Sequence, residues 1–324
     1  MMKKIYSILF FLAFVLSYAY GQQEPIYSQY MINPFVVNPA VSSTEDYIDF
    51  QSGYRSQWGN FDGGPRTIYL SGHATINKPF YHMHYKAEHK NWHGIGFQLM
   101  DDRIGPFHRN TFLVAYSYNI GLFGRTRLSI GAFAGVKQMQ TNQGYWENIP
   151  DDSDFLFRDN ISTGVKPEVQ FGASMYSKDY YVNLSTQNLI GNKDLTPGST
   201  EGSATEKFRI HTYLSAGKRF YINSNLFLTP STMIRYTPTA PISFDLNGKL
   251  EMENQFWGGM SLRKLEALNV FVGMLVQKKV ELTYAYEAGL GQLSSYHSGT
   301  HEIIVGLRLE HPQTVLNPSS FWEK

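Results

Sequence analysis

The stretch Arg109–Tyr118, which reads RNTFLVAYSY, decides the fold of this chain. Its larger apolar side chains fall on every second position, at Phe112, Val114, Tyr116 and Tyr118. The positions between them hold Thr111, Leu113, Ala115 and Ser117. A period of two is typical of a β-strand with two different faces. When such strands recur many times and the second face is mostly small, polar or charged, the pattern indicates a β-barrel in an outer membrane.

Segments of this kind recur along most of the chain. We predict an all-β fold, a transmembrane antiparallel β-barrel of about 14 strands. The predicted strands are Tyr47–Gln57, Arg66–Asn77, Trp92–Asp102, Arg109–Asn119, Arg125–Lys137, Pro167–Tyr176, Tyr180–Gln187, Arg209–Phe220, Phe227–Tyr236, Ile242–Glu251, Gln255–Leu262, Asn269–Val276, Lys279–Glu287 and Thr300–Glu310.

The connections between these strands support the same topology. Every second connection is short, namely Gly121–Gly124, Ser177–Asp179, Tyr221–Asn225, Met252–Asn254 and Gln277–Lys278. The connections of the other parity include the long, polar Gln138–Lys166, Asn188–Phe208 and Ala288–Gly299. Barrels of this class have short periplasmic turns and long outer loops, so both chain ends are expected in the periplasm. One expected periplasmic link, Lys78–Asn91, is longer and carries His82, His84 and His89.

The first residues have the features of an export signal. Lys3 and Lys4 precede the apolar stretch Ile5–Leu16, which is too short to span a membrane, since a spanning helix needs about 20 residues. Small residues around Ala19 and Gly21 predict cleavage before Gln22. We therefore expect four parts: a signal peptide (1–21), an irregular periplasmic or lumenal segment (22–46), an outer-membrane barrel (47–310) and a C-terminal tail (311–324).

Composition excludes several classes of function. The chain has no cysteine, which removes disulfide scaffolds and thiolate metal sites. A net charge of +1 argues against a nucleic-acid partner, which would need a basic field. Aromatic residues make up 15% of the chain, and the 22 tyrosines suit the interfacial girdles of a barrel in contact with outer-membrane lipid.

Charged and polar residues on the second strand faces are predicted to point into the lumen. They are Asp49, Gln51, Arg55, His73, Glu168, Gln170, Asn183, Asp245, Glu281, Glu287, Glu302 and Arg308. Both signs of charge are present, so these residues can pair with one another as plain structural satisfaction, or they can line a transport path.

No catalytic, cofactor or metal site is predicted. His211 and Ser215 share one face of a strand, as an activated serine would require, but any even spacing produces this pattern. Asp101–Asp102 and the acids Asp151, Asp152 and Asp154 are interpreted as solvated loop carboxylates. The histidines of Lys78–Asn91 lack a further evident metal ligand. We therefore expect the protein not to be an enzyme and to hold no cofactor.

Several motifs are specific enough to suggest a family. They are Gln29–Ala40 (QYMINPFVVNPA), Tyr54–Thr67 (YRSQWGNFDGGPRT), Leu70–His73 (LSGH), Asp101–Phe107 (DDRIGPF), Tyr284–Glu287 (YAYE) and Ser298–Ile303 (SGTHEI). In this order they resemble the PorP/SprF family of type IX secretion system membrane proteins, over nearly the whole chain after the signal. Glu287 replaces a common Asp, Thr300 replaces a Ser, and the tail after Leu309 is longer than usual.

The resemblance implies an outer-membrane barrel of gliding or type IX-secreting bacteria. It implies as partners a secreted surface protein, such as a motility adhesin, recognised through its C-terminal signal domain, and other secretion components. An alternative from another class is an outer-membrane channel for passive diffusion or uptake of small molecules, because strand number fixes a barrel's diameter and not its cargo.

The motifs also predict local structure. The two Asn-Pro units in Gln29–Ala40 should hold the chain extended, either in the lumen or at the periplasmic rim. Gly63 and Gly64 should provide positive φ in the turn Trp58–Pro65. His301 and Glu302, on the last strand, are expected to meet Arg55 or Gln57 and fix barrel closure, with His73 inside the lumen. Trp58 and Phe61, together with Tyr145, Trp146 and Phe155 of the long loop, are candidate partner-binding residues, although interfacial aromatics would look the same.

Overall fold

The computed structural model of the protein describes residues 29–76, 91–141, 164–190 and 209–310, apart from residues 239, 265, 292, 293 and 295. This part of the chain contains two short 3-10 helices, η1 (Pro34–Val36) and η2 (Pro39–Ser43), and a single sheet. The strands of the sheet are β1 (Tyr47–Ser56), β2 (Arg66–Ile76), β3 (Trp92–Ile104), β4 (Phe107–Phe123), β5 (Thr126–Thr141), β6 (Gly164–Tyr176), β7 (Tyr180–Gln187), β8 (His211–Lys218), β9 (Phe220–Tyr221), β10 (Leu226–Thr237), β11 (Ala240–Met252), β12 (Phe256–Arg263), β13 (Ala267–Val276), β14 (Val280–Gly289) and β15 (Thr300–Glu310).

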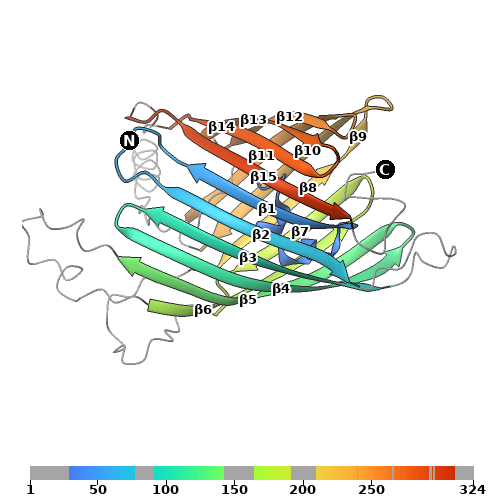
Figure 1. Ribbon diagram of the computed structural model, residues 1–324, viewed down its shortest axis with the longest axis horizontal. Helices are drawn as coiled ribbons and strands as arrows, with labels where there is room; N and C mark the ends of the chain where they lie inside the picture. Colours follow the sequence, from blue (N-terminus) through green and yellow to red (C-terminus); the bar gives the residue numbers. More distant parts are fainter. Residues whose placement is uncertain are drawn as a thin grey trace, which may run out of the picture.

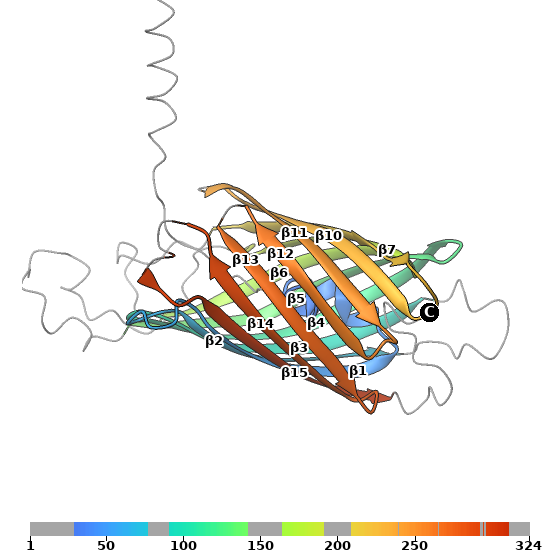
Figure 2. The same cartoon turned by 90° about the horizontal axis from the view of Figure 1, so that it is seen from above.

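The sheet closes on itself as an antiparallel barrel (Figures 1 and 2). Each strand pairs with its neighbours in sequence, and β15 pairs with β1. The segments β8 and β9 both pair with β10, so they are two pieces of one strand and the wall has 14 strands. The predicted closed barrel of about 14 strands is confirmed. Because every strand has two neighbours, no backbone edge is left unpaired toward lipid.

Alternation of side chains produces an apolar outer surface. On β13 and β14 the outward residues Val270, Val272, Leu282 and Tyr284 are all exposed, while their neighbours point inward. The same holds for Phe112, Val114 and Tyr116 on β4. This belt is the surface that lipid covers in an outer-membrane barrel.

Two sides of the barrel can be distinguished by their connections. One side, here called the inner end, carries the start of β1, the end of β15 and short turns such as Glu253–Asn254 and Gln277–Lys278. In both turns the two central residues have positive φ, between 52° and 57°. This is the geometry of tight hairpin turns that match the twist of the strands. The opposite side, the outer end, carries the connection between β1 and β2 and that between β14 and β15.

The predicted bounds of two strands at the outer end, and with them the interpretation of Asp102, require correction. β3 continues to Ile104 and β4 begins at Phe107, so only Gly105 and Pro106 lie between them. Asp102 is consequently not a solvated loop carboxylate. Its side chain is 2% exposed, points inward and accepts a hydrogen bond from Thr67 Oγ1 at 2.7 Å. Elsewhere, the predicted strand Arg209–Phe220 is interrupted at Arg219, whose side chain is buried and pairs with Glu251 at 3.1 Å.

Candidate functional site: a filled lumen and an outer rim

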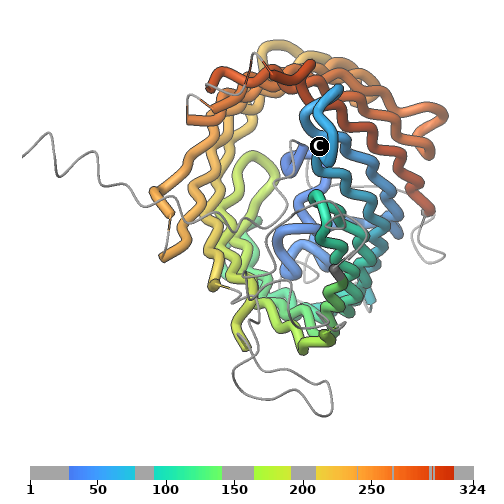
Figure 3. The backbone as a smooth tube through the Cα atoms, turned by 90° about the vertical axis from the view of Figure 1, so that its left-hand side faces the viewer, coloured from blue at the N-terminus to red at the C-terminus, as the bar shows by residue number. Residues whose placement is uncertain are grey.

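The N-terminal part of the described chain lies inside the barrel. We call residues 29–46 the lumen segment; Figure 3 shows it, in blue, surrounded by the ring of strands. At its start, Gln29 Nε2 donates a hydrogen bond to the backbone oxygen of Glu302, near the outer end of β15. Near its finish, Thr75 Oγ1 donates to the backbone oxygen of Glu45 at 2.6 Å, near the inner end of β2. The segment therefore runs along the lumen from the outer to the inner side.

The two Asn-Pro units fasten this segment to the wall. Asn33 Nδ2 donates to Ser71 Oγ at 3.0 Å, and Asn38 Nδ2 donates to the backbone oxygen of Ala173 at 3.1 Å. Asn38 Oδ1 also accepts from the backbone of Ala40 and so caps η2. Each proline begins a 3-10 helix, a position where its fixed φ fits and no donor is lost. The predicted irregular segment before the first strand is confirmed. Of the two asparagines only Asn38 has an extended backbone, and the segment lies in the lumen, not at the rim.

Apolar contacts join the lumen segment to opposite sides of the barrel. Phe35 is fully buried; its ring centroid lies 5.1 Å from that of Phe133 and 4.7 Å from that of His73. On the other side, Met31 and Ile32 pack against the cluster that contains Trp257, Phe271, Leu275 and Ala285. Such packing on both sides holds the segment as part of the core.

The wall is shaped to receive this segment. A Cβ added to Gly94 would lie 2.7 Å from the backbone of Ser42, and one added to Gly131 would lie 2.8 Å from the backbone nitrogen of Ala40. Larger residues at either position would displace the segment. Hydroxyl pairs complete the contact: Ser42 Oγ lies 2.8 Å from Ser117 Oγ, and Ser43 Oγ lies 2.9 Å from Ser129 Oγ.

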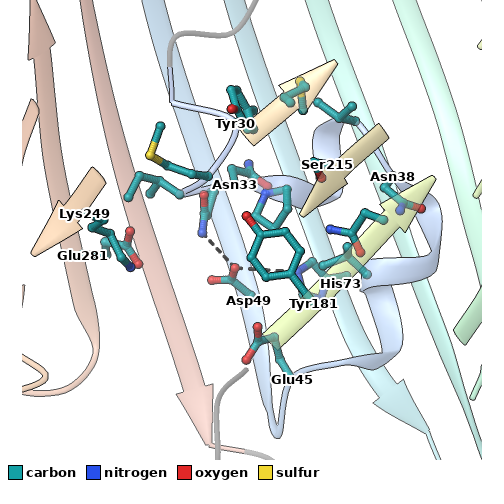
Figure 4. Close-up of a pocket in the computed structure, with 18 of the residues that line it drawn as sticks. Tyr30, Asn33, Asn38, Glu45, Asp49, His73, Tyr181, Ser215, Lys249 and Glu281 are labelled. Atoms are coloured by element: carbon teal, nitrogen blue, oxygen red, sulfur yellow. Dashed lines mark hydrogen bonds and ion pairs between the residues drawn. The ribbon is translucent and has the colours of Figure 1, made fainter. Parts of the chain in front are cut away.

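A cavity of about 90 Å³ lies beside the segment (Figure 4). Asp49 and His73 face each other across it, with 3.6 Å between Asp49 Oδ2 and His73 Nε2. Gln51 Nε2 donates to the same carboxylate at 2.9 Å, and Arg308 pairs with Glu281 at 2.9 Å. Tyr30 lines the cavity from the lumen segment. Burial raises the pKa of its phenol, and the hydroxyl oxygen accepts a hydrogen bond from Asn247 Nδ2.

Ion pairs connect six strands in the outer half of the lumen. Arg55 on β1 lies directly opposite Glu302 on β15 in the strand register, with 3.5 Å between Nε and Oε2. The pairs continue around the wall as Arg55–Glu287 at 3.4 Å, Arg263–Glu287 at 3.1 Å, Arg263–Asp245 at 3.6 Å and Arg235–Asp245 at 2.7 Å. This arrangement fits mutual satisfaction of buried charges across the seam where the barrel closes.

Three connections at the outer end are joined to one another. Gly59 N donates to Gly299 O at 2.8 Å, and Ser298 N donates to Gly59 O at 2.9 Å. Gly105 N donates to Gly63 O at 3.1 Å, which ties in the turn between β3 and β4. Gly63 has the expected positive φ of 74°.

Gly64 differs from the expectation for that turn, because its φ is not in the left-handed region. A side chain at this position would lie 2.7 Å from the backbone oxygen of Gln57, so close approach of the backbone is what requires glycine there.

Aromatic side chains stand on these joined turns. The rings of Trp58 and Phe61 meet edge to face with centroids 6.0 Å apart, and Trp58 lies 6.4 Å from the ring of His297. Phe61 is 49% exposed. We call these three residues the rim cluster. The other predicted partner-binding residues, Tyr145, Trp146 and Phe155, lie outside the described residues, as do Asp151, Asp152, Asp154 and the histidines of Lys78–Asn91.

The remaining predicted site residues fall in different places. His301 is exposed on the lipid-facing surface of the wall, where its Nδ1 lies 2.7 Å from the Tyr284 hydroxyl. It does not face Arg55 or Gln57, because the neighbours of the inward Glu302 along the strand must point outward. Gln57 lies just beyond β1 and pairs through its backbone nitrogen with Pro65 O at 2.8 Å. His73 is inside the lumen as expected.

No catalytic pair forms from His211 and Ser215. Four residues along one strand separate their Cα atoms by about 13 Å. His211 Nδ1 instead lies 2.9 Å from Thr237 Oγ1. Among the described residues, no group of His, Cys, Asp and Glu side chains could hold a metal ion. Nor does that part of the chain include a helix long and apolar enough to cross a membrane.

Sequence reasoning missed the residues that bind the lumen segment. Leu113, Phe133 and Ile304 are apolar, fully buried and on the inward face of their strands. An inward face that met only water would not need such residues, so their presence was the signal for a filled lumen.

Comparisons with known proteins place the chain in a family. Solved barrels that it resembles include a Pseudomonas aeruginosa FadL homologue, with 11% identity and a TM-score of 0.49 over 84% of this chain and 92% of that one. The Ralstonia pickettii toluene transporter TbuX gives 9% identity and a TM-score of 0.48 over 84% and 92%. The Acinetobacter baumannii outer membrane protein Omp33 gives 8% and 0.45 over 83% and 100%. A search of curated proteins found no match. The family profile described as type IX secretion system membrane protein PorP/SprF matches residues 19–307. The chain is therefore a member of the PorP/SprF family of type IX secretion membrane proteins, folded as an outer-membrane β-barrel.

Proposed function

We propose that this barrel is a non-enzymatic component of the type IX secretion and gliding machinery that docks or anchors a large secreted surface protein. The observation that carries this proposal is the lumen segment, which packs against opposite walls and takes the space that a transported solute would need. A barrel filled in this way works at its surfaces. Family membership supplies the process, protein secretion, and the C-terminal signal domain of the exported protein is the part we expect to be bound.

Within the described residues, the outer rim is the surface best suited to bind such a partner. The backbone hydrogen bonds between Gly59, Ser298 and Gly299 hold two connections together before any partner arrives. The rim cluster then offers exposed aromatic surface on a rigid base. Aromatic side chains that are already ordered lose little entropy on binding, which favours them as anchors in protein interfaces.

The rival function, a channel for small molecules, has less support. A diffusion path would need a continuous opening along the lumen, whereas the lumen segment packs against both sides of the wall. The apolar side chains that line the lumen contact the segment, as Phe133 contacts Phe35. They are accounted for by packing.

The proposal is tested by changing the rim while preserving the barrel. In the double variant Trp58→Ala with Phe61→Ala, we expect at least a tenfold loss of one large surface protein from the cell surface, with that protein shed into the medium or retained inside. The matched control is Phe123→Ala, which removes an aromatic side chain that is 68% exposed at the inner end. Quantitative mass spectrometry of surface-shaved cells and of the medium gives the readout.

Deletion of the whole gene should give the same protein-specific loss. An unchanged surface proteome in the deletion strain would contradict the docking function. A loss in the deletion strain that the rim variant does not reproduce would place docking elsewhere on the molecule.

A further inference from the structure

A row of basic side chains crosses three strands on the outer surface of the barrel. Arg66 on β2 lies directly opposite Arg103 on β3, and Arg103 lies opposite His108 on β4. All three residues are within two positions of the outer end of their strands. Arg66 and Arg103 are exposed and His108 is partly exposed, on the same face as the lipid-facing residues Ile68, Leu99 and Phe112.

The charges of this row are only partly balanced. Asp101 pairs with Arg103 at 3.1 Å and also with His108. Arg66 forms no ion pair with any residue of the described chain. Side chains directly opposite one another on paired strands have Cβ atoms about 4.5–5.5 Å apart, and like charges at this spacing destabilise the sheet. Two adjacent guanidinium groups, of which only Arg103 has a carboxylate beside it in the described chain, favour an added anion.

An apolar groove with a volume of about 420 Å³ lies directly beneath the row, toward the middle of the barrel. Its upper edge is polar, because Asp101, Asn110 and Gln138 line it. Its lower part is lined by Leu70, Leu99, Phe112 and Val136, while Ile68 lies in the upper row, directly opposite Asp101. In the strand register, the row containing Leu70, Leu99, Phe112 and Val136 is two rows below the arginines. The basic row and the apolar groove therefore lie one after the other along the strands, in the same order as the headgroup and the acyl chains of a lipid molecule.

We propose that this surface binds a phosphorylated lipid of the outer leaflet, with its phosphate on Arg66 and Arg103 and an acyl chain in the groove. Guanidinium groups bind phosphate oxygens through paired, charge-assisted hydrogen bonds. An acyl chain in the groove covers the apolar side chains that line it, and the van der Waals contacts between them stabilise the bound lipid. The site is separate from the rim cluster and the lumen, so it stands or fails independently of the docking function.

The binding test uses the full chain in nanodiscs of zwitterionic phosphatidylcholine, with bisphosphorylated lipid A as the probe. Each arginine near a charged membrane surface contributes about 1 kcal/mol, or roughly fivefold in affinity. We therefore expect Arg66→Gln with Arg103→Gln to bind lipid A about 25-fold more weakly. Arg125→Gln, which removes an exposed arginine at the inner end, is the matched control and should bind as the unaltered protein does. Heat-dependent gel migration verifies that each variant is a folded barrel.

Two further arms separate a lipid from a free anion. Dephosphorylated lipid A should bind at least tenfold more weakly than the phosphorylated probe. Leu70→Trp, which fills the groove without changing charge, should weaken binding of lipid A and leave binding of inorganic phosphate unaltered. Equal binding by the double-arginine variant and the control would overturn the proposal. Displacement of lipid A by low-millimolar inorganic phosphate, together with no effect of Leu70→Trp, would overturn it in favour of a simple anion site.

Discussion

Arg55 lies at the point where the barrel closes, and its contacts explain why a charged residue is kept in the lumen. It is 2% exposed and lies opposite Glu302 across the seam between β1 and β15, while Glu287 of β14 is also within ion-pair distance. A guanidinium between two carboxylates specifies which strands meet. The pairing of Arg55 with Glu302 could be suggested from the sequence because first and last strands of a barrel must be neighbours. The outward position of His301 follows from the same alternation once Glu302 is placed inside.

Replacing Arg55 with Met should destabilise the barrel by about 3–5 kcal/mol, because it leaves buried carboxylates without the guanidinium between them. The unfolding midpoint in urea, followed by gel migration in lipid vesicles, measures this change. The double variant Arg55→Met with Glu302→Gln should recover part of the loss, since one of the two carboxylates is then neutral. Arg125→Met, at an exposed position, is the control. If Arg55→Met were as stable as the control, the seam pairing would contribute nothing.

At the scale of elements, the strands were largely predictable and the lumen segment was not. Period-two patterns identified the strands because lipid outside and polar groups inside impose opposite chemistry on neighbouring residues. The predicted bounds of β3 and β4 were too short, because the added residues, such as Ile104, Phe107 and Phe123, lie next to the turns, where the alternation of apolar and polar residues ends. The Asn-Pro units predicted a break from regular structure, but their side-chain bonds to Ser71 and Ala173 depend on strands far away in sequence.

A disulfide can test the position of the lumen segment. Ser43 Oγ and Ser129 Oγ lie 2.9 Å apart, and the chain contains no cysteine of its own. The variant Ser43→Cys with Ser129→Cys should therefore form a disulfide during export, because the periplasm is oxidising. Maleimide labelling after denaturation should find no free thiol unless reductant is added. In the control, Ser43→Cys with Ser261→Cys, the second cysteine is on β12 instead, so both thiols should stay free; the reverse pattern would contradict the placement.

At the scale of the whole molecule, the barrel combines a lipid-covered wall, a filled interior and a pre-joined outer rim. The filled interior is what connects fold to function. Phe35, Met31 and Ile32 pack against opposite sides of the wall, and inward glycines leave space for the backbone of the segment. A barrel built in this way acts as a support for its outer surface, where a secreted protein can be held.

Conductance in planar lipid bilayers tests this central claim most directly. The full-length protein should give no steady current above the bilayer background, because the lumen segment occupies the path. A variant that lacks residues 29–43 and still migrates as a folded barrel should open a stable channel. Steady single-channel steps from the full-length protein, equal in size to those of the shortened variant, would contradict the account, since the lumen would then be open with the segment in place.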